Sequence, residues 1–336
     1  MVEIASGRLA VLFGASALIS AGLLWVLHPL LKRYALARPN ARSSHRAPTP
    51  QGGGIAVVAA TIMVAAGAFV LTPGGFEQPL RVAVILAGAV ALAGVGAIDD
   101  IRPLGIWPRL LLQAVAVIVV LAALPAGLRV MPWLPLWVER AVIFVGVLWF
   151  VNLVNFMDGI DWITVAETVP LTAALVLFAA MGALPRDAGL VAVALCGAMV
   201  GFAPFNRPVA RVFLGDVGSL PVGLLLAWML VLLAGGGHLA AAALLPLYYL
   251  ADATVTLLRR LANGEAVTQA HRSHFYQRAT GKFTVMQVVG QVFALNLVLA
   301  ALALATLLAP SLLVHAAALL IGGVLVAALL YRFAKA

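Results

Sequence analysis

Residues 204–235 read PFNRPVARVFLGDVGSLPVGLLLAWMLVLLAG, a polar loop that passes directly into a long apolar run. The loop contains Asn206, Arg207, Arg211 and Asp216 among glycines and prolines. The apolar run that follows is long enough to cross a hydrocarbon core of about 30 Å. Such a stretch belongs at a membrane edge, where Asp216 could hold a metal ion and the arginines could meet phosphate.

Apolar runs of this kind recur along the whole chain. Of its 336 residues, 64% are hydrophobic and 10% are charged, whereas a soluble domain is about half apolar and about a quarter charged. The first run is too long for a signal-peptide core and lacks a convincing cleavage site, so we expect a retained span. The sequence predicts an all-α polytopic membrane protein in which residues 1–336 form one integral-membrane domain of about 11 helices. The expected spans are 9–30, 53–72, 81–98, 107–124, 138–154, 164–181, 188–203, 217–235, 239–258, 284–308 and 312–331.

The distribution of charge orients these spans. With eleven spans, the odd-numbered loops share one side with the C-terminus, and that side holds 16 of the 21 lysines and arginines. This excess indicates that the basic loops face the cytoplasm, with the N-terminus periplasmic and the C-terminus cytoplasmic. The net charge of +9 is thereby explained without a nucleic-acid partner.

Eight acidic residues fall on the same side as the basic loops. Carboxylates beside a membrane are costly unless they are paired or bind a metal, so they indicate function. Together with the bases, they predict a site for a polyanion and a divalent cation. These acids are Asp99, Asp100, Asp158, Asp161, Glu167, Asp216, Asp252 and Glu265.

Two of the cytoplasmic loops suggest phosphate and metal chemistry. The glycines of RPNARSSHRAPTPQGGG, residues 38–54, can bring backbone N–H groups to phosphate, although the loop also suits a basic anchor on anionic lipid. Asp99 and Asp100 repel each other at a helix end, so we expect a bound cation or a raised pKa there. A solvated helix end is the alternative for this pair.

Two further loops carry polar side chains at helical spacing. Asn155, Asp158 and Asp161 are three residues apart, so one helical turn aligns them for magnesium or a nucleotide; a capped helix junction is the alternative. His271 and His274 could bind zinc, but no third histidine or cysteine is near, and phosphate contacts fit better. The lone cysteine excludes an internal disulfide.

These motifs together resemble the bacterial polyprenyl-phosphate N-acetylhexosamine-1-phosphate transferases, the glycosyltransferase 4 family that includes phospho-N-acetylmuramoyl-pentapeptide transferase. The resemblance covers nearly the whole chain and has five motifs in family order. They are Pro39-Asn-x-Arg42-x-x-His45 with Pro50-x-x-Gly-Gly54, Asp99-Asp100, Asn155-x-x-Asp158-Gly-x-Asp161, Asn206 to Gly215-Asp216-x-Gly-Ser219, and the histidine loop.

The resemblance implies transfer of a sugar 1-phosphate from a UDP-sugar to undecaprenyl phosphate, with release of UMP. It implies a cytoplasmic site in the bacterial inner membrane that requires Mg²⁺, with Mn²⁺ as a possible substitute, and it allows a homodimer. Asp216 and Asn155 would hold the metal, and Asp99, Asp100 and Asp216 would be catalytic. The residues expected to contact substrate are Arg46, Asp158, Gly159, Ile160, Asp161, Asn206, His271 and His274.

Three departures from the family pattern lie where sugar and nucleotide should be recognised. Ser43 and Ser44 precede the first histidine, Ser273 replaces a histidine, and Trp162 stands where glycine is usual. The form of the histidine loop is more like that of O-antigen and surface-polysaccharide initiators than the peptidoglycan enzyme. The alternatives are a peptidoglycan or teichoic-acid precursor enzyme, a transporter and a catalytically inactive scaffold.

Overall fold

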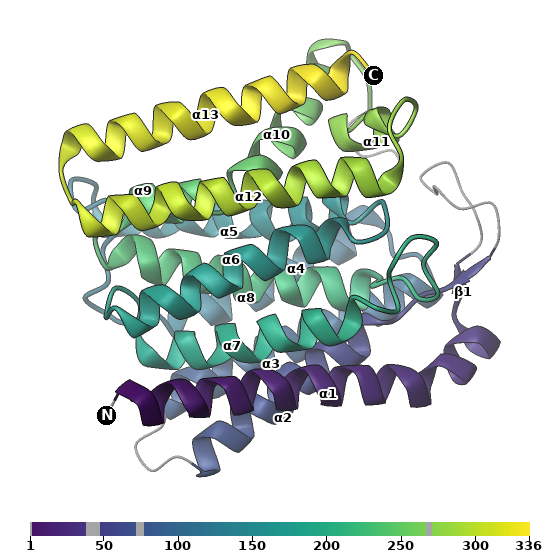
Figure 1. Ribbon diagram of the computed structural model, residues 1–336, viewed down its shortest axis with the longest axis horizontal. Coiled ribbons are helices and arrows are strands. Elements are labelled where there is room, and N and C mark those ends of the chain that lie inside the picture. The colour runs from purple at the N-terminus through teal and green to yellow at the C-terminus, as the bar shows by residue number, and fades with distance from the viewer. Residues whose placement is uncertain (1, 38–47, 72–76, 267–270) are drawn as a thin grey trace.

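The protein is a bundle of helices in a computed structural model that describes residues 2–37, 48–71, 77–266 and 271–336 (Figure 1). Two strands pair antiparallel beside the end of the first helix, β1 (Leu36–Ala37) with β2 (Thr49–Pro50). The helices are α1 (Val2–Tyr34), α2 (Gly54–Leu71), α3 (Pro79–Ile101), α4 (Ile106–Ala122), α5 (Leu136–Met157), α6 (Ile163–Ala180), α7 (Arg186–Phe202), α8 (Asp216–Gly235), α9 (Leu239–Leu244), α10 (Leu247–Ala262), α11 (Phe275–Ala279), α12 (Val285–Leu308) and α13 (Leu312–Ala334).

Each expected span coincides with one helix except the ninth. The prediction of one continuous helix over 239–258 is wrong, because α9 ends at Leu244 and α10 begins at Leu247. Pro246 lies at the break, where its missing N–H and its ring disfavour an uninterrupted helix. The bundle therefore contains a divided helix whose second half leads into the histidine loop.

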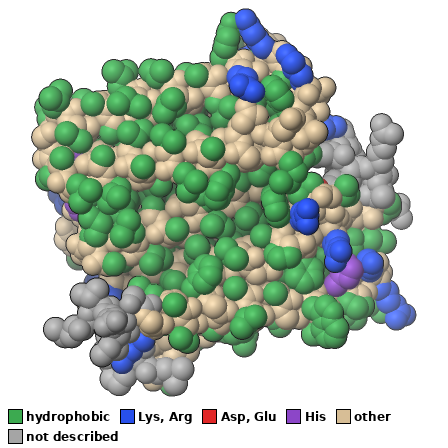
Figure 2. Space-filling model, in the orientation of Figure 1, with side chains coloured by type: hydrophobic (Ala, Val, Ile, Leu, Met, Phe, Trp, Pro, Cys, Tyr) green, Lys and Arg blue, Asp and Glu red, His purple; other side chains and the backbone are tan. Residues whose placement is uncertain are grey.

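The helices have the length and the surface of a membrane protein. Among the described residues, seven helices are long and apolar enough to cross a membrane, namely α1, α3, α5, α6, α8, α12 and α13. Apolar side chains are spread over the whole face in Figure 2, and most of the visible lysines and arginines lie toward the end where α13 terminates. The prediction of an all-α multi-pass membrane protein is confirmed.

Helix α8 is the centre of the bundle. In its apolar window 94% of the residues are buried, against 17% in each of α1 and α13, which therefore lie at the periphery. It packs against α2, α3 and α5. Because Asp216 is the first residue of α8, a carboxylate lies at one end of the central helix.

Glycines allow the neighbouring helices to approach the start of α8. A Cβ added to Gly54 of α2 would lie 2.1 Å from the Cα of Gly218, and one added to Gly96 of α3 would lie 2.2 Å from the carbonyl oxygen of Asp216. Neither position has room for a side chain, since real Cβ contacts are never so short. These contacts fix the height of α8 relative to α2 and α3.

A polar contact joins α12 to α6 inside the bundle. The amide nitrogen of Asn296 donates hydrogen bonds to the carboxylate of Glu167 at 2.7 Å and to the carbonyl of Ala166 at 3.1 Å. Both side chains are buried. Glu167 is part of α6 and does not belong to the polar loop that precedes this helix. Buried polar groups need such partners because an unpaired one is costly in an apolar slab.

The loop before α8 is joined to the loop after β2 by backbone hydrogen bonds. Phe213 donates to Pro50 at 2.8 Å, Gly53 donates to Phe213 at 2.9 Å, and Gly54 donates to Leu214 at 2.8 Å. Two loops that are far apart in sequence thus form one surface at the end of α8.

We expect Gly96→Ala to destabilise the fold by about 1–3 kcal/mol, because the added methyl group collides with the first turn of α8. Gly94→Ala is the matched control, since nothing lies within 4 Å of a Cβ at that position. It should be neutral or stabilise the helix by up to about 1 kcal/mol. Thermal unfolding in detergent measures both variants, and equal stability of the two would contradict the close-packing argument.

Candidate active site

Asp100 caps the central helix. Its carboxylate oxygens accept hydrogen bonds from the backbone N–H groups of Asp216 at 3.0 Å and Val217 at 3.1 Å. These N–H groups have no partner within α8, and a carboxylate there also interacts favourably with the helix dipole. The backbone carbonyl of Asp100 accepts a further bond from the Gln51 amide at 2.8 Å, which ties in the first loop.

Asp99 and Asp216 share one guanidinium group. Arg109, in the first turn of α4, donates to the carboxylate of Asp99 at 3.0 Å and lies 3.8 Å from that of Asp216. Asp99 also accepts the backbone N–H of Leu104 at 2.6 Å. The side chain of Asp216 is 27% exposed, against 9% for Asp99, so Asp216 is the carboxylate more open to a bound molecule.

Asn155 joins this acidic group from the end of α5. Its amide nitrogen donates to the carboxylate of Asp216 at 2.7 Å and to the hydroxyl of Ser219 at 2.9 Å. The structure therefore brings together Asp99, Asp100, Asn155 and Asp216, which the sequence motifs singled out separately. Of the three carboxylates, Asp99 and Asp216 lie beside Arg109, and Asp100 accepts the backbone N–H groups at the start of α8.

The loop between α5 and α6 is held to the loop before α8 by two buried side chains. Asp161 accepts the backbone N–H of Ala210 at 3.0 Å. Asn206 accepts the N–H of Trp162 at 2.7 Å and donates to the carbonyl of Val212 at 3.0 Å. These two predicted substrate residues thus brace the loops, and the predicted Ile160 places its side chain in the hydrophobic core.

Trp162 adopts a backbone conformation that usually needs glycine. Its φ of 65° lies in the left-handed region, which glycine adopts without strain and other residues adopt rarely. Its indole N–H donates to the carbonyl of Ala203 at 2.5 Å and holds the residue in place. Trp162 therefore places a bulky side chain at a position whose backbone conformation suits glycine.

Asp158 lies in the same loop, in a poorly solvated position. Burial raises the pKa of its carboxyl to about 7, and the nearby charges of Asp100 and Asp161 act in the same direction. The hydroxyl of Thr164 donates to it at 2.5 Å, which opposes the increase in pKa. Near neutral pH this carboxyl is thus divided between its acid and ionised forms.

Asp252, within α10, anchors the histidine loop. Its carboxylate accepts the backbone N–H groups of Phe275 and Tyr276, each at 3.0 Å, and lies 3.4 Å from Nδ1 of His274. Asp252 is fully buried, so these bonds replace solvent for its carboxylate. The rings of His271 and His274 lie 4.9 Å apart, so both predicted histidines belong to one cluster.

The histidine loop also packs on the loop that carries Asp158. The hydroxyl of Tyr276 donates to the carbonyl of Phe156 at 3.1 Å. A Cβ added to Gly159 would lie 2.2 Å from the same hydroxyl oxygen, so only glycine fits there. The histidines and the acidic cluster therefore lie on one end of the bundle.

The structure leaves the metal prediction untested. In the part of the chain that the structure describes, no group of three or more His, Cys, Asp or Glu side chains is arranged to hold an ion. Among the described residues, His271 and His274 therefore have no third side chain placed to complete a zinc site. Arg46 and the motif residues from Arg38 to His45 lie outside the described residues.

The structure adds residues that the motifs did not single out. Arg109 was counted only as a cytoplasmic base, and Gln51 only as part of a glycine-rich loop. A signal for Arg109 is its place in the first turn of a helix, ten residues after Asp99. Asp252 was named only among the acids on the basic side, and its role as an anchor depends on contacts over 23 and 24 residues that spacing does not reveal.

The sequence of this chain is similar to those of known proteins. The model of glycosyl transferase family 4 matches residues 82–234, which contain the acidic cluster. A phospho-N-acetylmuramoyl-pentapeptide-transferase of Synechococcus sp. (strain JA-3-3Ab) is 30% identical over 88% of this chain and 91% of its own length.

Two other relatives have different names. A probable undecaprenyl-phosphate N-acetylglucosaminyl 1-phosphate transferase of Bacillus subtilis is 24% identical over 81% of this chain and 80% of its own length. A decaprenyl-phosphate N-acetylglucosaminephosphotransferase of Mycobacterium leprae is 31% identical over 61% of this chain. The chain spans 56% of that mycobacterial relative's length.

The fold and the polar end of the bundle define a multi-pass membrane protein with an acidic site at the start of its central helix. The full-length similarity to the Synechococcus protein gives the family. The chain belongs to glycosyl transferase family 4.

We expect stability to fall as pH rises through 7 because of Asp158. The pKa of Asp158 is higher in the folded protein than in the unfolded chain, so the folded protein keeps a proton that the unfolded chain releases. The contribution of this bound proton to the free energy of unfolding is therefore lost as the pH approaches and passes 7. Thermal unfolding of wild type and Asp158→Asn between pH 5 and 8 measures this. The variant should show the smaller loss, and parallel curves would contradict the assignment.

We expect Asp252→Asn to loosen the histidine loop, because an amide cannot accept both backbone N–H groups in the same way. The stability cost should be about 1–3 kcal/mol, with faster hydrogen exchange at Phe275 and Tyr276. Glu265→Gln is the control, since Glu265 is exposed and pairs only with Arg260 among the described contacts. Unchanged exchange at Phe275 and Tyr276 in Asp252→Asn would remove the anchoring role.

Proposed function

We propose that this protein transfers an N-acetylhexosamine 1-phosphate from a UDP-sugar to undecaprenyl phosphate and releases UMP. The product would start a lipid-linked surface polysaccharide of the O-antigen type at the cytoplasmic face of a bacterial inner membrane. The observation that carries the proposal is the convergence of Asp99, Asp100, Asn155 and Asp216 at the start of α8 in a chain of this family. The names of the relatives, which all describe polyprenyl or muramoyl phosphotransferases, support the reaction class.

The reaction needs little covalent help from the protein. An oxygen of the lipid phosphate attacks the β-phosphorus of the UDP-sugar, the bond from that phosphorus to the bridging oxygen breaks, and UMP leaves with the electron pair. The lipid phosphate is already anionic near neutral pH, so a strong base is dispensable. The requirements are in-line positioning and neutralisation of negative charge.

The acidic donors fit a magnesium ion. Asp216 keeps a partly exposed carboxylate, and Mg²⁺ is usually held by one or two carboxylates together with substrate phosphates and water. Such a site does not require three protein ligands, so the absence of a three-residue group among the described side chains is compatible with it. We assign Asp216 as the main ligand and the amide of Asn155 as the second; Mn²⁺ offers the same chemistry. When bound, the ion would neutralise charge on the diphosphate.

The other residues have positioning and binding roles in this proposal. Asp100 holds the first turn of α8, and with it the backbone of Asp216. Arg109 is the cation beside Asp216, so we place a phosphate of the acceptor or donor next to it, with Asp99 orienting its guanidinium group. The loop of Asp158 and the paired histidines His271 and His274 would contact the nucleotide, phosphate or sugar, with Arg46 adding positive charge.

A peptidoglycan precursor enzyme is the second candidate. The full-length similarity to the Synechococcus relative favours it, because that protein is named for transfer of a phospho-N-acetylmuramoyl-pentapeptide. Trp162 and Ser273 argue against it, since they change the loops that would read the donor. The donor that gives lipid-linked product in the assay below decides between the two candidate functions.

Membranes containing the protein, incubated with undecaprenyl phosphate, Mg²⁺ and radiolabelled UDP-GlcNAc, UDP-GalNAc or UDP-N-acetylmuramoyl-pentapeptide, should release UMP and form labelled lipid from an N-acetylhexosamine donor. Lipid product from the pentapeptide donor alone would favour the second candidate. No product from any donor, with folded protein present, would reject the enzyme activity.

We expect Asp216→Asn to lower transfer on the order of 100-fold or more, because it removes the main metal ligand and one of the two carboxylates beside Arg109. Expression and thermal stability should stay close to wild type. Glu77→Gln is the matched control, as it makes the same carboxylate-to-amide change at an exposed position in the loop before α3. Near-normal turnover in Asp216→Asn would take this residue out of the metal site.

A further inference from the structure

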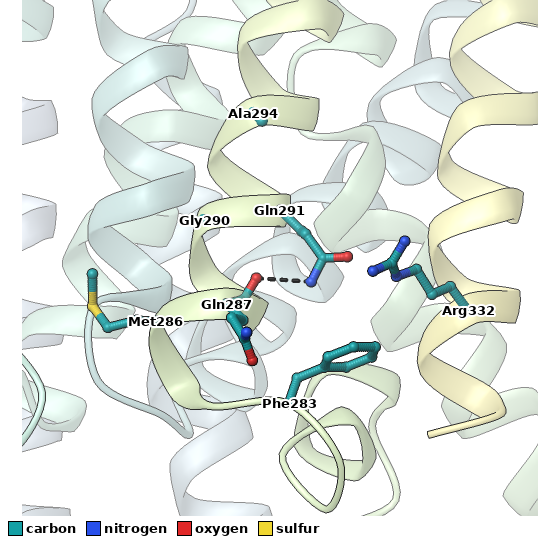
Figure 3. A pocket seen from close by; sticks show the side chains of 7 residues that line it. All are labelled: Phe283, Met286, Gln287, Gly290, Gln291, Ala294 and Arg332. Atoms are coloured by element: carbon teal, nitrogen blue, oxygen red, sulfur yellow. Dashed lines mark hydrogen bonds between the residues drawn. The ribbon is translucent and has the colours of Figure 1, made fainter.

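A groove lies between α12 and α13, on the side of the bundle away from α8. It has a volume of about 370 Å³ and is lined by Phe283, Met286, Gln287, Gly290, Gln291, Ala294 and Arg332 (Figure 3). This volume is at the small end of the range of about 300–1,000 Å³ for ligand pockets, so it suits a headgroup or part of a chain. Both helices expose large apolar side chains, such as Met286 in α12 at 47% and Leu320 farther along α13 at 69%, as expected of helices that face lipid.

The groove opens at the end of the bundle that carries the acidic site. In α11, the guanidinium group of Arg278 donates to the carbonyl of Ala334 in α13 at 3.3 Å. The rings of Phe283 and Phe333 lie 6.4 Å apart beside this contact. Since α11 also packs on the loop of Asp158, the start of α12 and the end of α13 lie at the same membrane edge as the site.

The groove has one positive wall and no acidic neighbour in its own part of the chain. The guanidinium carbon of Arg332 lies 5.2 Å from the centre of the Phe283 ring, and its side chain is exposed. After Glu265 the chain has no acidic residue, whereas it has five basic ones: Arg272, Arg278, Lys282, Arg332 and Lys335. A cation at a membrane edge among other cations favours an anionic headgroup.

The floor of the groove is formed by two small residues of α12. Gly290 and Ala294 are four residues apart, so they lie on one face of α12, and nothing lies within 4 Å of a Cβ added to Gly290. The amide of Gln291 extends toward Arg332, whereas the amide oxygen of Gln287 accepts the backbone N–H of Thr284 at 3.0 Å and caps the start of α12 (Figure 3). Gln291 donates one of its two N–H groups to the carbonyl of Gln287 at 2.8 Å, which keeps its amide on the groove side.

We propose that this groove binds an anionic phospholipid of the surrounding bilayer. Arg332 holds the phosphate, the second N–H of the Gln291 amide hydrogen-bonds to the headgroup or ester oxygens, and one acyl chain lies along Gly290 and Ala294. A lipid in this place joins the start of α12 to the end of α13, next to the α11 segment. The proposal concerns binding alone and does not depend on the proposed transfer reaction.

Native mass spectrometry of the detergent-purified protein tests the proposal, with added phosphatidylglycerol or phosphatidylcholine of the same acyl chains. We expect preferential retention of phosphatidylglycerol. Arg332→Gln should weaken its binding by about fivefold, the effect of one cation near an anionic lipid. Gly290→Leu, which fills the groove from its floor, should remove the preferred lipid.

Two variants provide matched controls. Arg33→Gln removes another exposed arginine that lies over an aromatic ring at a helix end, 5.2 Å from the centre of the Tyr34 ring. Gly323→Leu adds the same bulk to an exposed glycine of α13 with nothing within 4 Å. Neither residue lines the groove, so both variants should retain phosphatidylglycerol as the wild type does. Thermal unfolding checks that all four variants are folded, and Gly290→Ala replaces Gly290→Leu where it is not.

Three outcomes would overturn the proposal. Equal retention of the two phospholipids would remove the preference for an anionic headgroup. An equal loss of phosphatidylglycerol binding in Arg332→Gln and Arg33→Gln would show that binding depends on the total positive charge of the protein and not on this groove. Displacement of phosphatidylglycerol by equimolar undecaprenyl phosphate, or by a second copy of the chain on dimer formation, would assign the groove to that occupant instead.

Discussion

The hydrogen bonds from the start of α8 to the carboxylate of Asp100 are the contacts on which this end of the protein depends. A helix enclosed by other helices cannot turn its first N–H groups toward water, so another part of the chain must accept them. Asp100 does so from α3, and Gly96 one turn earlier lets the two helices approach closely enough. The carboxylate that accepts these hydrogen bonds also places its neighbour Asp99, with Arg109, beside Asp216. The same contact therefore determines the helix packing and the arrangement of the polar site.

Much of this arrangement could be predicted from the sequence because the apolar runs and the charge asymmetry are strong signals. The loops with Asp99, Asn155, Asp158 and Asp216 were correctly grouped on one end of the bundle. The break at Pro246 was not predicted, since the apolar run continues through it and one proline does not reveal whether a helix bends or ends. Length and hydrophobicity therefore locate the helices better than their interruptions.

What each polar side chain does at the site was less predictable. Asp161 and Asn206 have the composition of binding residues, yet in the fold they accept and donate backbone hydrogen bonds that join two loops. Asp252 was one acid among eight in the sequence, yet in the fold it anchors the segment that carries the histidines. A motif identifies which residues are needed at a site, whereas the choice between holding a loop and holding a ligand depends on contacts between distant segments.

The buried bond between Asn296 and Glu167 has a consequence for how α12 sits in the membrane. Apolar helices can slide along one another with little change in contact area, but moving α12 by one turn, about 5.4 Å, would leave both polar groups without a partner in the apolar slab. The hydrogen bond between Asn296 and Glu167 therefore fixes the position of α12 relative to α6 along the helix axis. Because α11 and the Phe283 segment lie just before α12, the depth of that single helix also sets the height of the histidine loop above the acidic site.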